Sequence, residues 1–153
     1  MLHFAYGSNM HRGVMCKHAP TAVPIGLARL ANYRFVITSD GYASVEPAQA
    51  QFVDGVMWRL TPRDRVILDL WENVAAGQYR GEILPVLQGW RRRPSLVYVA
   101  RRRPVGKPKS GYMEIIVKAA REWEMPADYI ASLEKWLPTR KFGAGYRKLG
   151  EFG

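Results

Sequence analysis

Short runs of alternating or continuous apolar residues, bounded by Gly, Pro, Asn and Asp, dominate the first 100 residues of the chain. Runs of this kind are typical of β-strands that bury one or both faces. They predict strands over residues 3–6, 24–30, 33–38, 52–60, 79–87 and 95–100.

Apolar side chains spaced by three and four residues predict helices, most of them in the remainder of the chain. One helix begins at Thr61, which can cap it, with Pro62 at the first helical position and Asp64 near its positive end. Its apolar side is predicted to consist of Val66, Ile67, Leu70 and Trp71.

Three further helices are expected. A short one covers about residues 10–16, with Ser8 or Asn9 as its cap. Another opens at Pro126 and is closed by Pro138, with one apolar face made of Tyr129, Ile130, Leu133, Trp136 and Leu137. The clearest amphipathic helix carries the stripe Tyr112, Ile115, Ile116, Ala119, Ala120 and Trp123.

Strands followed by helices, with a single helix inserted at Thr61, indicate an α+β fold with a mixed, mostly antiparallel sheet. We expect this sheet to be closed, or nearly closed, into a small barrel flanked by helices, although the pattern alone does not establish the closure. No repeat or linker divides residues 1–137, which we interpret as one domain, and residues 138–153 form a basic, Gly-rich tail.

The composition of the chain agrees with a single globular domain. With 153 residues and 48% hydrophobic side chains, the chain is long enough to build a core without disulfides, and it has a single cysteine, Cys16. No apolar run approaches the ~18 residues that a membrane span needs, and the first residues lack the features of a signal peptide. We therefore predict a cytoplasmic protein without membrane association.

Positive charge is concentrated in the second half of the chain. The net charge is +10, and residues 91–153 carry 15 basic and 6 acidic side chains against 8 and 7 in residues 1–90. Two arginine triplets, 91–93 and 101–103, flank the predicted strand 95–100. No motif of a nucleic-acid-binding module accompanies them, so we expect a solvated basic face and keep a basic nucleic-acid-binding protein only as an alternative. The oligomeric state is not indicated.

The common signatures of metal and cofactor sites are missing from the sequence. The histidines His3, His11 and His18 have no metal-ligand spacing, and no carboxylate completes an HExxH-type site. The phosphate-binding, dinucleotide-binding and GxSxG patterns are also missing. We predict neither a metal nor a cofactor.

One candidate site is the segment Tyr6, Gly7, Ser8 and Asn9 between the opening strand and the first helix. Gly7 has no Cβ and Asn9 tolerates left-handed conformations, so consecutive N–H groups can point at one anion. The helix start adds its own free N–H groups. On composition alone this segment is only an ordinary strand-to-helix turn.

The other candidate is Glu72, which follows the helix that begins at Thr61. It lies near the negative end of that helix, with Trp71 and Val74 beside it, and both influences oppose ionisation of its carboxyl group. A carboxylic acid acquires in this way a pKa suited to proton transfer near neutrality. The competing interpretation is a solvated glutamate at a helix end.

These segments resemble the γ-glutamylcyclotransferase family, which includes the plant AIG2-like proteins. Phe4-Ala5-Tyr6-Gly7-Ser8-Asn9-Met10 is similar to its opening motif, and Leu68-Asp69-Leu70-Trp71-Glu72 with Gly77-Gln78-Tyr79 is similar to the segment of its catalytic glutamate. The resemblance covers about residues 3–137, including Gly41-Tyr42-Ala43-Ser44-Val45, residues 55–61, Pro108, Ser110, Tyr112, Pro126 and Tyr129. Asn73 stands where the family often has glycine.

The resemblance implies an enzyme that cyclises a γ-glutamyl amino acid, peptide or amine to 5-oxoproline and releases the amine. It implies that Glu72 is catalytic and that substrate is bound by Tyr6, Gly7, Ser8, Asn9, Met10, Tyr79 and Tyr112. Tyr79 could instead be a half-buried strand residue, and Tyr112 a core residue of its helix. The leaving group of the substrate stays open, and a non-catalytic protein that binds a small ligand with the same fold is the main alternative function.

Overall fold

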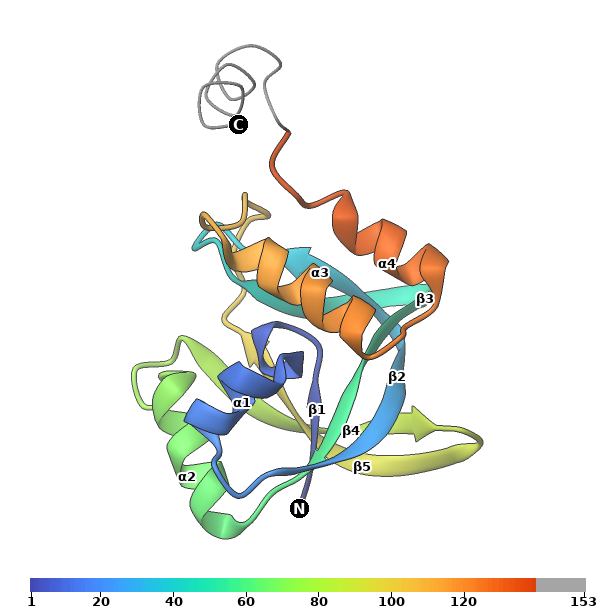
Figure 1. The fold of residues 1–153 in the computed structure, drawn as a ribbon. Helices are drawn as coiled ribbons and strands as arrows, with labels where there is room; N and C mark the ends of the chain where they lie inside the picture. The colour runs from blue at the N-terminus through green and yellow to red at the C-terminus, as the bar shows by residue number, and fades with distance from the viewer. Residues whose placement is uncertain (140–153) are drawn as a thin grey trace, which may run out of the picture.

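The apolar strands pair into a closed barrel whose order is β1-β3-β2-β4-β5 (Figure 1). The computed structural model describes residues 1–139. Parallel pairing is confined to β1 and β5, which meet at His3 and Leu96, and the other neighbours are antiparallel. The predicted α+β fold with a mixed, mostly antiparallel, closed sheet is confirmed. The strands are β1 (Leu2–Ala5), β2 (Val23–Ile37), β3 (Ala43–Arg59), β4 (Tyr79–Gln88) and β5 (Arg91–Ala100).

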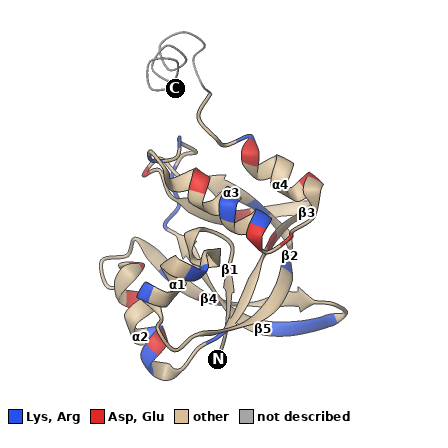
Figure 2. Ribbon diagram, viewed as in Figure 1, with Lys and Arg blue, Asp and Glu red and all other residues tan. Residues whose placement is uncertain are grey.

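Three strand boundaries differ from the predictions. The predicted strands 24–30 and 33–38 are joined in one strand, β2, which ends at Ile37. Asn32, with φ 61°, takes up a register shift as a bulge and does not end the strand. Strand β3 begins at Ala43, well before the predicted start at residue 52. Strand β5 begins at Arg91, so the first arginine triplet lies inside a strand, paired with residues 86–88 of β4. Figure 2 shows this basic stretch along the outer part of β5.

The first helical segment is divided. A 3-10 turn, η1 (Ser8–Met10), precedes α1 (Arg12–His18). The cap of α1 is His11, whose Nδ1 accepts hydrogen bonds from the N–H groups of Gly13 and Val14. The expectation of Ser8 or Asn9 as the cap is therefore wrong, since both residues lie in the preceding turn.

The start of α2 (Pro62–Trp71) is as predicted, but its buried side is not. Thr61 and Asp64 form a capping box, with Pro62 in the first turn. Val66, Leu70 and Trp71 are 62%, 73% and 58% exposed, whereas Leu68 is fully buried. The helix rests on a narrow row spaced by four residues, Asp64 and Leu68, and Glu72 continues this row just beyond its last turn.

Two helices close one side of the molecule. Helix α3 (Tyr112–Glu122) packs against η1 and against α4 (Ala127–Glu134), as Figure 1 shows. The predicted amphipathic helix is confirmed, with a buried face made of Met113, Ile116, Val117, Ala119 and Ala120. Ile116, Ala119 and Ala120 were predicted for this face, while Met113 and Val117 replace Tyr112 and Ile115. This packing places Tyr112, at the first turn of α3, beside the turn that follows β1.

No helix within residues 1–139 is long and apolar enough to cross a membrane. The predicted tail, residues 138–153, lies outside the described residues except for its first two positions.

Candidate functional site

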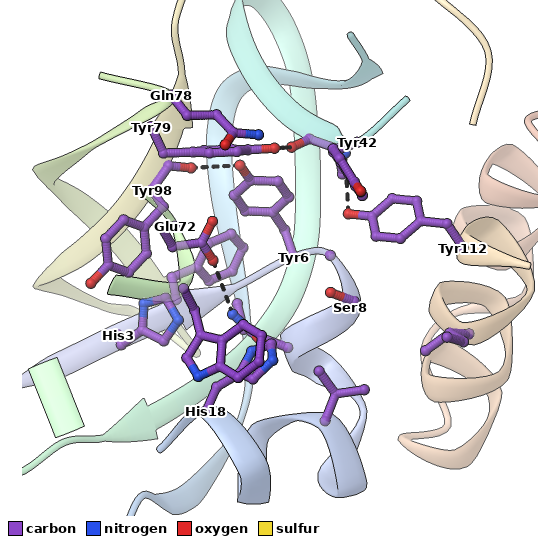
Figure 3. A pocket seen from close by; sticks show the side chains of 18 residues that line it. His3, Tyr6, Ser8, His18, Tyr42, Glu72, Gln78, Tyr79, Tyr98 and Tyr112 are labelled. Carbon is purple, nitrogen blue, oxygen red and sulfur yellow. Dashed lines mark hydrogen bonds between the residues drawn. The ribbon is translucent and has the colours of Figure 1, made fainter. Parts of the chain in front are cut away.

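A cavity of about 440 Å³ lies at one end of the barrel, where β1 runs into η1 (Figure 3). Its walls come from segments far apart in the chain: β1 and η1, α1, the end of α2, the start of β4, β5 and the first turn of α3. Six of the predicted binding residues and the predicted catalytic one line it, namely Tyr6, Gly7, Ser8, Asn9, Tyr79, Tyr112 and Glu72. The fold thus brings together most of the residues that the sequence singled out.

Glu72 occupies the C-cap position of α2 and points into this cavity (Figure 3). Burial raises the pKa of its carboxyl group to about 7, and the nearby charge of Asp69 acts in the same direction. A hydrogen bond from Asn9 Nδ2 to Glu72 Oε1, 3.2 Å long, favours the charged form and limits this rise in pKa. A carboxyl group balanced in this way can both take up and give back a proton near neutral pH.

The chain turns sharply directly after Glu72. Asn73 has φ 53°, in the left-handed region, and its Nδ2 donates to Gln78 Oε1 over 3.3 Å. Asparagine is among the few residues other than glycine that adopt this conformation at low cost. The replacement of the family's frequent glycine by Asn73 is therefore compatible with the turn that directs Glu72 inward.

The backbone of the opening turn differs from the conformation we expected. Gly7 has φ −111° and ψ −140°, and neither Gly7 nor Asn9 is left-handed. The space at position 7 is narrow: a Cβ there would lie 3.3 Å from Tyr112 Oη and 3.5 Å from the Cβ of Ala43, so the tyrosine hydroxyl would have to shift by a few tenths of an ångström. Within the 3-10 turn, the N–H groups of Met10 and His11 donate to the carbonyl oxygens of Gly7 and Ser8. The N–H groups of Ser8 and Asn9 come before these donors and have no acceptor within the turn.

Met10 is the one predicted binding residue that does not line the cavity. Its side chain is fully buried in the core, and its carbonyl oxygen accepts a hydrogen bond from Trp123 Nε1 at 2.8 Å. The side chain of Met10 therefore supports the turn from behind.

Tyr79 and Tyr112 both form hydrogen bonds with the backbone of Ala43, at the start of β3. Tyr79 Oη donates to the carbonyl oxygen of Ala43 over 2.6 Å, and Tyr112 Oη accepts from its N–H over 3.1 Å. Burial raises the pKa of Tyr112 to about 12 and that of Tyr79 further, so both hydroxyls are protonated at neutral pH. Both rings form walls of the cavity, so neither of the alternative interpretations, a strand or a core residue, describes them fully.

His18 is a site residue that the sequence analysis missed. Its ring stacks on Trp71, with the centroids 4.1 Å apart, and its Nδ1 lies 2.8 Å from Asn9 Oδ1. Burial lowers the pKa of His18, so the ring is neutral at pH 7 and Nδ1–H can donate to the Asn9 oxygen. This contact orients the amide of Asn9 with its NH₂ group toward Glu72.

His3 and Tyr98 also line the cavity without having been predicted. His3 Nδ1 lies 3.0 Å from the carbonyl oxygen of Leu96, and burial lowers the pKa of its ring to about 4. Tyr98 Oη donates to Asp69 Oδ1 over 2.6 Å, while its carbonyl oxygen accepts from Tyr6 Oη. No local motif surrounds either residue, because strands β1 and β5 meet only in the closed barrel.

In residues 1–139, no group of three or more His, Cys, Asp or Glu side chains lies close enough to hold a metal ion. The prediction that the protein needs neither metal nor cofactor stays a prediction.

Comparison with known proteins identifies similar chains. The model of the AIG2-like family matches residues 52–133. A gamma-glutamyl cyclotransferase of known structure superposes with a TM-score of 0.85 at 23% identity, over 100% of this chain and 99% of its own. An uncharacterized protein from Homo sapiens gives 0.84 at 24% identity, over 99% and 96% of the two chains.

A third solved structure, YkqA from Bacillus subtilis, gives a TM-score of 0.75 at 22% identity and covers 88% of this chain and 53% of its own. No curated protein matches in sequence. At these identities the structural likeness establishes the fold, and the family match covers more than half of the chain.

Proposed function

This chain belongs to the AIG2-like family, and on that premise we propose that it is a γ-glutamylcyclotransferase. It would cyclise a γ-glutamyl amino acid, peptide or amine to 5-oxoproline and release the amine. The observation that carries the proposal is Glu72, a partly buried carboxyl group with a pKa of about 7 at the wall of a cavity of about 440 Å³. The shared fold with a gamma-glutamyl cyclotransferase also supports it.

Such a reaction makes few chemical demands on the protein. The nucleophile is the α-amine of the substrate itself, so no activated serine or cysteine is required. A cavity that folds the substrate back on itself gains the advantage of an intramolecular reaction, up to ~7–11 kcal/mol in well-oriented cases. The protein must supply a proton carrier and a place for negative charge.

Glu72 is the proposed proton carrier. Its carboxylate takes a proton from the substrate ammonium group, and the freed amine attacks the γ-carbonyl carbon to form the ring C–N bond. As the old C–N bond breaks, Glu72 gives this proton to the leaving nitrogen. Glu72 carries the second proton that the α-nitrogen must lose in the same way. The α-nitrogen therefore loses two protons in all, and the leaving nitrogen gains two. Because the resting carboxylate must be ionised, kcat/KM should rise with pH up to about 7.

The turn over Gly7, Ser8 and Asn9 is the proposed site for negative charge. The free amides of Ser8 and Asn9 can donate to an anion, either the α-carboxylate of the substrate or the oxyanion of the tetrahedral intermediate. A complex with 5-oxoproline separates the two assignments, since this product keeps the α-carboxylate and has a neutral lactam oxygen. A carboxylate seated on the turn assigns these amides to substrate binding.

The decisive experiment assays a small panel of γ-glutamyl compounds for 5-oxoproline by mass spectrometry, with wild type, Glu72→Gln and the exposed control Glu122→Gln. We expect Glu72→Gln to lower the single-turnover rate at least ~100-fold, the usual contribution of a general acid-base, with binding retained within tenfold. The control should match wild type.

A loss of less than tenfold in Glu72→Gln would remove Glu72 from the mechanism. Binding of γ-glutamyl compounds by wild type without any 5-oxoproline would instead favour a non-catalytic binding protein of the same fold.

A further inference from the structure

A second hollow of about 410 Å³ adjoins the cavity of Glu72. The two spaces share Tyr42 and Gln78 as lining residues, so a molecule that fills the first can extend into the second. The other residues around the second hollow are Asp40, Asn73, Ala76, Arg103 and Lys109. Its lining is therefore mostly polar or charged, unlike the aromatic wall around Glu72.

The charges around this hollow do not cancel. Arg103 Nη1 lies 2.8 Å from Asp40 Oδ1, in a pair whose side chains are 33% and 34% exposed. Lys109 Nζ lies 5.4 Å from the centre of the Tyr42 ring, and within residues 1–139 no carboxylate oxygen lies within 4.0 Å of it. Two cations and one carboxylate leave one positive charge at the mouth of the cavity.

The backbone that carries both basic residues is bound to the neighbouring turn. The segment that follows β5 is bound to the turn between β2 and β3 by three hydrogen bonds: Ser39 N–H to the oxygen of Pro104, Gly106 N–H to that of Ile37 and Lys109 N–H to that of Gly41. Their lengths are 2.8, 2.8 and 3.1 Å. The backbone at Arg103 and Lys109 is therefore fixed relative to this turn, and their exposed side chains start from defined positions.

Gly41 explains how the stem of Lys109 comes so close to this turn. Gly41 has φ +88°, and a Cβ at this position would lie 2.6 Å from Lys109 Cγ. The lysine stem occupies the space that a side chain at residue 41 would need. The position of its ammonium group over Tyr42 thus depends on the glycine.

We propose that Arg103 and Lys109 form the subsite for the leaving group and select one that carries a carboxylate. This inference rests on the proposed γ-glutamylcyclotransferase function. With the reacting γ-carbonyl beside Glu72, the leaving group extends past Tyr42 and Gln78, and its carboxylate balances the excess positive charge. Arg103 has N–H donors beyond the one that binds Asp40, and guanidinium groups bind carboxylates through several of them at once. The substrates are then γ-glutamyl amino acids or short γ-glutamyl peptides, in preference to γ-glutamyl amines.

The test uses two substrates that differ only in that carboxylate, γ-glutamylalanine and γ-glutamylethylamide, with 5-oxoproline as the readout. Wild type should turn over γ-glutamylalanine with at least a tenfold higher kcat/KM, and the preference should shrink with added salt. Lys109→Gln and Arg103→Gln should each raise KM for γ-glutamylalanine at least fivefold, with kcat little changed and γ-glutamylethylamide unaffected. Lys107→Gln and Arg102→Gln are the matched controls and should behave as wild type.

The outcomes separate the two proposals. Equal kcat/KM for both substrates in wild type, or an equal loss for both in the Lys109→Gln variant, overturns the leaving-group subsite and leaves the proposed function standing. The absence of 5-oxoproline from both substrates in wild type overturns the proposed function, and the subsite with it.

Discussion

At the scale of single residues, the chemistry of the site depends on two opposing effects on the pKa of Glu72. Burial opposes the charged form of its carboxyl group, while the Asn9 amide supports it. His18 enters this balance indirectly, since its hydrogen bond to Asn9 Oδ1 keeps the amide hydrogens directed at Glu72. A carboxyl group solvated at a helix end would keep a pKa too low to return a proton to a departing nitrogen.

The raised pKa of Glu72 predicts a pH-dependent stability. The folded protein binds a proton at this group up to about pH 7, whereas the unfolded chain releases it near 4.5. Between these values the folded state holds more protons, so its free energy of unfolding falls as the pH rises, by on the order of 3 kcal/mol for this group at most. Glu72→Gln has no such charge and should be more stable than wild type at pH 8, with a much smaller difference at pH 4.

Urea unfolding of wild type and Glu72→Gln at pH 4, 5.5 and 8 measures this effect, and Glu122→Gln, at an exposed site on α3, is the control. A difference in stability between wild type and Glu72→Gln that does not change with pH would show that Glu72 is ionised without penalty in the folded protein.

At the scale of elements, α2 carries Glu72 to the cavity wall. Only the row of Asp64 and Leu68 is buried, so the direction of the helix depends on its cap and on one core side chain. The capping box also contacts the chain before β2, because Thr61 Oγ1 lies 3.0 Å from Thr21 Oγ1 and Asp64 Oδ1 accepts from the Thr21 N–H. The start of α2 is thus bound to a second segment.

Thr61→Ala should therefore destabilise the protein without disturbing the site. Loss of the hydroxyl group that accepts from the Asp64 N–H costs about 1 kcal/mol, equivalent to about 2–4 °C in Tm for a domain of this size. Glu72 lies at the other end of the helix, so kcat/KM should stay within about twofold of wild type. Thermal unfolding and the 5-oxoproline assay test both parts, with Arg63→Ala, an exposed change in the same turn, as the control. Unchanged Tm would contradict the role of the cap.

At the scale of the whole molecule, closure of the barrel joins the parts of the site. Strand β1 is paired with β3 on one side and meets β5 on the other, and it leads directly into the Tyr6 to Asn9 turn. Gly55, on β3, allows β1 to come close: a Cβ there would lie 2.4 Å from the oxygen of Ala5 and 2.7 Å from the Phe4 ring. Backbone contact at this point positions the turn against Glu72.

Gly55→Ala is expected to separate β1 from β3. Overpacking of this kind costs about 1–3 kcal/mol, and we expect the upper end because the obstructing atom belongs to the backbone. Since β1 leads into the turn, kcat/KM should fall together with Tm. Gly89→Ala, in the hairpin turn between β4 and β5, is the control: nothing lies within 4 Å of the added Cβ, so only the backbone strain of its φ of +60° remains and Tm should fall less. A Tm within 2 °C of wild type for Gly55→Ala would contradict this account of the closure.

The sequence by itself determined the α+β class, the positions of most strands and the start of α2. These features arise from interactions within a few residues: the alternation of apolar side chains, and the capping of Asp64 N–H by Thr61 three positions away. Local chemistry made Glu72 and the Tyr6 to Asn9 turn candidates, the resemblance to a known motif favoured them over the alternatives, and both line the cavity.

Only the tertiary structure decided which side of α2 is buried and that Gly7 lies close to Tyr112 and Ala43. It also decided that His18, Tyr98, Arg103 and Lys109 lie beside the two spaces of the site. The physical reason is that each of these facts depends on a neighbour distant in the chain. Asn9 meets Glu72 across 63 positions, Gly7 meets Tyr112 through the docking of α3, and Arg103 meets Asp40 across a further 63. Local sequence patterns cannot predict these long-range contacts, because the contacts form only when the barrel closes.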